Sequence, residues 1–134
     1  MTTVLIVEDD PDIRDLVTTL LSTAVDEVLS AGDGEEALAL AERRDIDVVV
    51  LDLALPGDRN GLDVLAELRA GGHPARTMLL TAYAGAEDRA TALRAGADVF
   101  VPKPFKIMEL VAQVLELAQR PAHAPPAAPT TEPA

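Results

Sequence analysis

Two kinds of segment alternate along residues 2–120. Short runs rich in β-branched residues, without alternating polar positions, are typical of strands buried on both faces. Between these runs, apolar residues recur every three or four positions, as on one face of an amphipathic helix. The predicted strands are Thr3–Val7, Val28–Ala31, Val48–Leu51, Thr77–Leu80 and Val99–Val101.

Capping and stop signals set the expected ends of the helices. Asp10 is a plausible N-cap for a helix with Pro11 in its first turn, and Asp33 with Glu36 has capping-box spacing. Gly96 follows the fourth helical segment as a C-terminal stop. The expected helices run from about Pro11 to Leu21, from Asp33 to Ala41, from Asn60 to the Gly71-Gly72 pair, from Ala86 to Ala95 and from Ile107 to Ala118.

The order of these segments is five repeats of strand and then helix. This alternation predicts an α/β fold: a five-stranded parallel sheet with right-handed crossovers and helices on both faces, a doubly wound architecture. In such sheets ligands bind beyond the carboxyl ends of the strands. The residues that follow each strand are therefore the candidates for function.

Polar residues with a common chemistry stand at these strand ends. Glu8 and Asp9 follow the first strand, Asp52 ends the third, Thr81 ends the fourth and Lys103 follows the fifth. Clustered carboxylates repel one another unless a cation joins them, and such hard oxygen ligands suit Mg²⁺. A hydroxyl and an ammonium opposite the metal would complete a clamp able to stabilise a phosphoryl group.

Composition narrows the class of protein. The chain has 134 residues, enough for one domain, and its formal charge is 11 basic minus 23 acidic residues, or −12. This charge disfavours direct binding to nucleic acid. There is no cysteine, and no apolar run approaches the roughly 18 residues of a membrane span. We therefore expect a cytoplasmic protein without membrane insertion.

Residues 121–134 differ in composition from the rest, with five Pro and five Ala in fourteen positions. Pro at this density excludes helix and sheet. We expect a domain over residues 1–120, followed by a disordered tail or the beginning of a linker.

Four motifs carry a resemblance to a known family: VLIVEDDPDIR at the start, VVVLDLALPG around Asp52, LLTAYA around Thr81 and GADVFVPKPF near the end. In this order and spacing they resemble the receiver domain of two-component response regulators, of the stand-alone CheY-like type, over about residues 2–120. The resemblance implies the strand order 2-1-3-4-5. It also implies a signalling domain rather than an enzyme, with only intrinsic self-phosphorylation and autodephosphorylation.

The resemblance assigns a role to each strand-end residue. Asp52 would be the phosphoacceptor, taking a phosphoryl group from a histidine kinase or a histidine phosphotransfer protein. Asp9 would be the main carboxylate ligand of Mg²⁺, with Glu8 acting mostly through water. Asp52 itself and the backbone carbonyl of Ala54 complete the implied ligands, and Lys103 would pair with Asp52 and then with the phosphoryl group.

The remaining implied roles concern switching and lifetime. Thr81 would be the switch hydroxyl and Phe100 the switch aromatic, although Phe100 could equally be a core residue. The Lys103–Pro104 peptide bond is commonly cis in the family. Tyr83, two residues after Thr81, is expected to shield the phosphoryl group from water.

The chain departs from the family pattern at two places. The loop from Gly57 to Gly61 holds one residue more than is common. Val99 and Gln113 stand where members that dimerise through the fourth helix, fifth strand and fifth helix often carry charges, which makes that dimer doubtful. No DNA-binding segment follows, so we expect output through a partner protein, a relay histidine or a domain absent from this chain.

Three other functions fit parts of the sequence. A pseudo-receiver that binds a partner without phosphorylation remains the alternative. A phosphatase with an aspartate nucleophile would need a second acid where Ala54 stands. The run from Gly32 to Ala37 fits the dinucleotide pattern GxGxxA, but its three acidic residues would repel a pyrophosphate.

Overall fold

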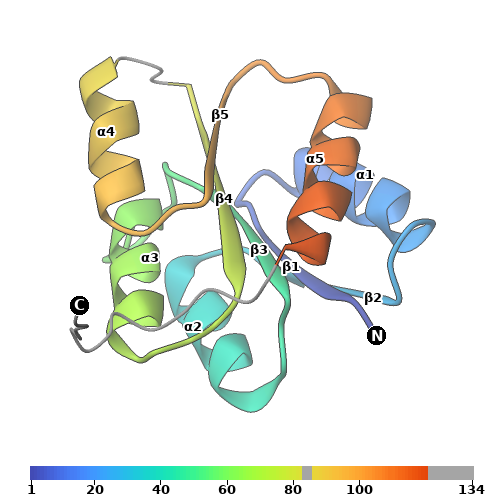
Figure 1. Ribbon diagram of the computed structural model, residues 1–134, viewed down its shortest axis with the longest axis horizontal. Coiled ribbons are helices and arrows are strands. Elements are labelled where there is room, and N and C mark those ends of the chain that lie inside the picture. Colours follow the sequence, from blue (N-terminus) through green and yellow to red (C-terminus); the bar gives the residue numbers. More distant parts are fainter. Residues whose placement is uncertain (83–85, 121–134) are drawn as a thin grey trace, which may run out of the picture.

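The computed structural model describes residues 1–82 and 86–120 and forms a single five-stranded parallel sheet in the order β2-β1-β3-β4-β5 (Figure 1). The strands are β1 (Thr3–Val7), β2 (Glu27–Ala31), β3 (Val48–Asp52), β4 (Arg76–Thr81) and β5 (Val99–Pro102). The helices are α1 (Pro11–Ser22), α2 (Gly34–Arg43), α3 (Gly61–Ala70), α4 (Ala86–Arg94) and α5 (Ile107–Gln119). The predicted doubly wound fold and its strand order are confirmed.

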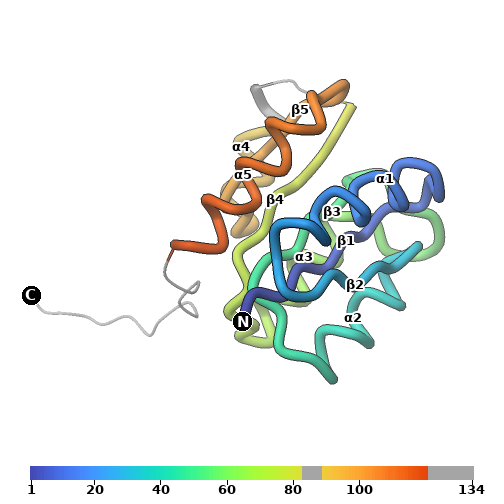
Figure 2. The backbone as a smooth tube through the Cα atoms, turned by 90° about the vertical axis from the view of Figure 1, so that its right-hand side faces the viewer, coloured from blue at the N-terminus to red at the C-terminus, as the bar shows by residue number. Residues whose placement is uncertain are grey.

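Helices cover both faces of the sheet. The views in Figures 1 and 2 place α1 and α5 on one side and α2, α3 and α4 on the other. Every residue of β1, β3 and β4 is buried, which is what two covered faces require. The unbroken apolar runs of the sequence are explained by this burial.

The core consists of two clusters, one on each face, supplied by alternate residues of the same strands. In β3, Val49 and Leu51 belong to the cluster beneath α2, α3 and α4. Val48 and Val50 belong to the cluster beneath α1 and α5. A strand points successive side chains to opposite faces, so each central strand anchors both helical layers.

The helix starts follow the predicted caps, with one difference. The Asp10 carboxylate accepts hydrogen bonds from the first turn of α1, and Asp33 accepts one from the Glu36 amide at 2.8 Å. The Glu36 carboxylate, however, accepts from the Gly32 amide rather than from the N-cap amide. A complete reciprocal capping box occurs instead at Asn60, with Asp63, at the start of α3.

The strands after β1 extend beyond their predicted ends by one residue at one or both termini. Asp52 is the last residue of β3 and Thr81 the last residue of β4, because each pairs in register with the neighbouring strand. Two predictions, the tail at 121–134 and the role of Tyr83, lie outside the described residues. Within the described ranges, no helix combines the length and apolarity needed to cross a membrane.

Candidate functional site

Parallel register brings the predicted site residues to one edge of the sheet. Val7 pairs with Leu51, Asp52 pairs with Leu80, and Thr81 pairs with Pro102. The carboxyl ends of β1, β3, β4 and β5 are therefore level. The side chains that follow these ends come from distant parts of the chain and share one polar site.

Asp52 is the most constrained carboxylate of the site. Asp52 is 4% exposed, and each of its carboxylate oxygens accepts a hydrogen bond. Oδ1 accepts from the Ala54 amide at 3.1 Å, and Oδ2 accepts from Lys103 Nζ at 2.8 Å. A buried carboxylate held by two donors keeps one orientation, with little rearrangement available to it.

Glu8 lies beside Asp52 and is also buried, at 3% exposed. Burial first, and then the negative charge of Asp52, raise the pKa of Glu8 to about 7. The Asp10 amide and the charge of Lys103 act in the opposite direction. A cation between the two acids would favour the charged form of Glu8 against both burial and the like charge of Asp52.

Lys103 connects the two buried acids. Its Nζ lies 2.8 Å from Asp52 Oδ2 and 3.4 Å from Glu8 Oε1. Burial disfavours its charge, but the hydrogen bond and charge of Asp52, together with Glu8, outweigh this and raise the pKa of Lys103. The Lys103–Pro104 peptide bond is cis, as the family resemblance implied.

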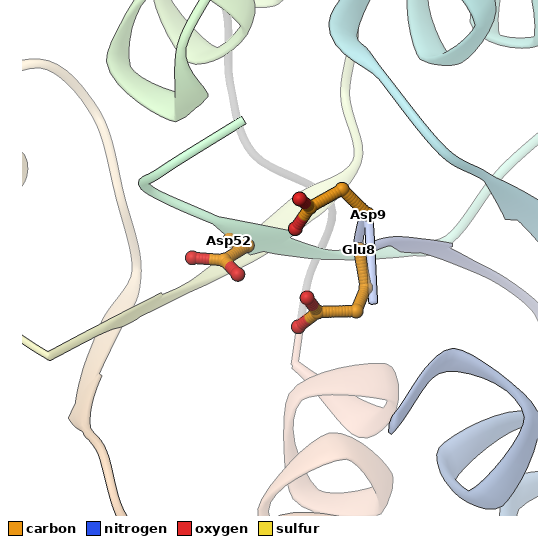
Figure 3. Close-up of side chains that lie close together, drawn as sticks. All are labelled: Glu8, Asp9 and Asp52. Atoms are coloured by element: carbon orange, nitrogen blue, oxygen red, sulfur yellow. The ribbon is translucent and has the colours of Figure 1, made fainter. Parts of the chain in front are cut away.

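A divalent cation fits the three acids. One oxygen from each of Glu8, Asp9 and Asp52 can be chosen so that all lie within 4.8 Å of one another. Figure 3 shows the carboxylates of Glu8 and Asp9 directed toward Asp52. Asp9 is exposed while the other two are buried, so the group opens to solvent on one side. This donor set, all oxygen and partly open to water, suits Mg²⁺.

The three acids stand in a shallow pocket of about 330 Å³. Its lining residues are Glu8, Asp9, Asp10, Ile13, Asp52, Ala54, Ala82 and Lys103. Ala54 is exposed and too small to cover the acids. The pocket can therefore admit a group carried on another molecule.

Thr81 and Phe100 lie close by but are buried. Thr81 is 1% exposed, and its carbonyl accepts from the Lys103 amide. Phe100 is 5% exposed and packs in the core beneath α4, with the Arg89 guanidinium 5.8 Å from its ring centroid. This contact is within the range of a cation–π interaction.

Two positioning residues were not found by sequence reasoning. Arg14 in α1 donates from Nη1 to the Glu8 carbonyl at 3.0 Å and so supports the turn that presents Glu8 and Asp9. At Gly61 a Cβ atom would lie 2.4 Å from the Asp52 carbonyl oxygen, so only glycine allows α3 to begin against the end of β3. In the sequence Arg14 ends the motif VLIVEDDPDIR, but no local pattern indicates a hydrogen bond to the Glu8 carbonyl.

The fold and the acidic pocket together define a class: doubly wound domains with a buried aspartate at the end of the third strand. The model of the response regulator receiver domain family matches residues 4–115. The chain therefore belongs to the receiver domains of response regulators.

Known proteins agree with this membership. The chain is 44% identical over 118 residues to the "Probable transcriptional regulatory protein TcrX" of Mycobacterium tuberculosis, covering 88% of this chain and 50% of TcrX. It is 40% identical over 120 residues to the transcriptional regulatory protein CpxR of Klebsiella pneumoniae, covering 90% of this chain and 50% of CpxR. The chain thus spans about half the length of these relatives.

A solved structure gives the same result for the fold. The receiver domain of the Francisella response regulator 1452 matches with a TM-score of 0.84 at 30% identity, covering 89% of this chain and 98% of that one.

Proposed function

We propose that this receiver domain accepts a phosphoryl group on Asp52 from a phosphohistidine of a histidine kinase or histidine phosphotransfer protein, with Mg²⁺ as cofactor. The observation that carries the proposal is the buried Asp52 held between the Ala54 amide and Lys103, with Glu8 and Asp9 beside it. A response regulator receiver is a signalling domain, and this site has the chemistry for transfer of a charged group.

In the proposed reaction a carboxylate oxygen of Asp52 attacks the phosphorus in line. The bond from phosphorus to the donor nitrogen breaks, and the imidazole leaves with the electron pair. Bound Mg²⁺ would be held by Glu8, Asp9, Asp52 and the Ala54 carbonyl, and it would neutralise charge on the phosphoryl oxygens. Lys103 is placed to balance the same charge, since its ammonium already contacts Asp52.

The proposed switch uses Thr81 and Phe100. The Thr81 hydroxyl would turn toward a phosphoryl oxygen, and Phe100 would follow into the space that Thr81 leaves. Support comes from the register, which places Thr81 opposite Pro102 and next to Lys103, and from the position of Phe100 on the adjacent strand. An unidentified output partner would read this change.

A phosphodonor experiment tests the proposal. The protein is incubated with an acyl phosphate and Mg²⁺, and intact mass is followed over time. We expect one phosphoryl group per chain, lost on replacing Asp52→Asn and on chelating the metal. No incorporation would favour a phosphorylation-independent interaction module, and many turnovers of donor without stable product would indicate a phosphatase.

A separate variant tests the proposed role of Asp9 as a ligand of Mg²⁺. Asp9→Asn should abolish Mg²⁺-dependent labelling while its circular dichroism spectrum matches that of the parent, because Asp9 is exposed and carries no core packing. Undiminished labelling of this variant would refute the role of Asp9.

A further inference from the structure

The loop of residues 53–60, between β3 and α3, carries Ala54 and the extra residue noted in the sequence. Its end is closed by the hydrogen bond from the Gly61 amide to the Leu53 carbonyl at 2.8 Å. Residues 54 and 56–58 are exposed, whereas Leu55 is buried in the core cluster that also contains Val64. Leu55 therefore anchors the first half of the loop, and the second half, residues 56–60, depends on other side chains for its position.

Arg59 provides a connection from this loop to two helices. Its Nε lies 2.5 Å from Glu67 Oε2 in α3, and its Nη1 lies 3.2 Å from Glu35 Oε2 in α2. The side chains of Arg59, Glu67 and Glu35 are 35%, 47% and 70% exposed, so both ion pairs are in contact with solvent. One guanidinium therefore links the loop to the start of α2 and to the middle of α3.

The backbone packs closely at the same place. A Cβ atom at Gly34, the first residue of α2, would lie 3.0 Å from Arg59 Cβ and 3.2 Å from its carbonyl oxygen. The loop therefore rests on α2 where α2 has no side chain. From this position the Arg59 side chain contacts the carboxylates of Glu35 and Glu67.

We propose that Arg59 is a positioning residue: by linking the loop of residues 53–60 to Glu35 and Glu67, it keeps Ala54 in place beside Asp52 for Mg²⁺ binding. The inference rests on the proposed function, in which the Ala54 carbonyl is a metal ligand. Without this link the longer loop would gain freedom, and metal binding would have to order it again.

Replacing Arg59 removes both a positive charge and a positioning contact. These two losses should change the affinity for Mg²⁺ in opposite directions. Removing a positive charge from the protein can only strengthen cation binding through electrostatics. Loss of positioning weakens it. Weaker Mg²⁺ binding by Arg59→Ala is therefore not explained by charge.

The experiment is a calorimetric titration of MgCl₂ into the unphosphorylated protein, comparing the parent, Arg59→Ala and Arg43→Ala. Arg43 is an exposed arginine in the last turn of the same helix α2, and its replacement changes net charge equally. We expect Arg59→Ala to bind Mg²⁺ about two- to fivefold more weakly, as suits partly exposed ion pairs, and Arg43→Ala to match the parent. Thermal melting in EDTA verifies that both variants are folded.

Equal or tighter binding by Arg59→Ala, or equal weakening by both variants, would overturn the proposal. If Arg59→Ala does not fold, Arg59→Lys takes its place, since it keeps the charge but not the two-sided contact; weaker binding supports the link and unchanged binding refutes it. If the parent protein binds no Mg²⁺, the proposed function is refuted. If the parent binds Mg²⁺ and Arg59→Ala binds it equally well, only the role of Arg59 is refuted.

Discussion

At the scale of single residues, the geometry of the site depends on a glycine at a position where a Cβ atom would clash with the backbone of β3. The start of α3 lies directly on the last residue of β3, and Gly61 makes that approach possible. The end of β3, which carries Asp52, is thereby coupled to the position of α3.

Gly61→Ala is expected to destabilise the protein by roughly 1–3 kcal/mol or more, because its Cβ would lie 2.4 Å from the Asp52 carbonyl oxygen. Urea unfolding measures the change. Gly71→Ala is the matched control, since the φ of Gly71 is −82° and the atom nearest to a Cβ there, the Glu67 carbonyl oxygen, is 3.4 Å away. Similar losses in both variants would contradict the steric explanation.

His73 gives a residue-scale prediction about pH. Burial, and then the charge of Arg69, lower its pKa from 6.5 against the opposing effects of Ala41 and Asp45. Its Nδ1 accepts from the Ala75 amide at 3.1 Å, a bond that protonation of Nδ1 would break. Below pH 6.5 the unfolded chain binds this proton more readily than the folded one, so stability falls as pH falls through that value.

The prediction concerns the difference in the free energy of unfolding between the parent and His73→Gln. Relative to His73→Gln, the parent should lose free energy of unfolding between pH 8 and pH 5.5, with titration of the acids common to both. Denaturant unfolding at each pH measures this difference. If the free energy of unfolding of the parent minus that of His73→Gln stays constant or rises toward acid, His73 does not favour its neutral form in the fold.

At the scale of elements, buried arginines hold the end of the sheet opposite the site. Arg69 of α3 donates to the carbonyls of Gly96, His73 and Ala75 and pairs with Asp98 at 3.2 Å. Arg76 of β4 donates to the carbonyls of Leu117 and Ala118 in the last turn of α5. These contacts satisfy backbone groups that helix ends and loops leave unpaired.

Arg76→Ala should loosen the C-terminal turn of α5, which has no basic residue of its own there. We expect a loss of about 1–3 kcal/mol in the free energy of unfolding, because two carbonyls lose a charged donor. Hydrogen exchange should rise first in the last turn of α5. Arg120→Ala, a change at the exposed residue just after α5, should leave both measurements close to the parent.

At the scale of the whole molecule, the sheet gathers negative charge at one edge of a protein whose formal charge is already −12. Burial first, and then the negative charge of Asp52, raise the pKa of Glu8, so part of that rise reflects repulsion between the gathered charges. Such a site is less stable without a cation than with one, so metal binding and folding stability are linked.

Asp9→Asn is therefore expected to raise the melting temperature in EDTA, by a few degrees, through relief of like-charge repulsion. Asp9 is a better choice than Asp52, because Asp52 would also lose its ion pair with Lys103. Added MgCl₂ should raise the melting temperature of the parent and have much less effect on the variant. A variant that melts below the parent in EDTA would argue against repulsion at this site.

The sequence by itself determined the architecture and the chemistry of the strand ends. Apolar runs such as Val48–Leu51 indicated strands covered on both faces, and strand–helix alternation implied that Glu8, Asp52 and Lys103 would meet at one edge. These conclusions need only local periodicity and the geometry of a parallel sheet. The strand order needed the family resemblance, because alternation alone is compatible with several orders.

Only the tertiary structure decided which of these groups are buried and how they pair. Glu8 and Asp9 are adjacent in sequence, yet one is buried against Lys103 and the other faces solvent. The sequence does not distinguish the roles of Arg14, Arg59 and Arg76. In the structure each contacts a different partner, and the packing of the elements determines which one. Burial and long-range pairing depend on where helices come to rest on the sheet, and local sequence patterns do not contain that information.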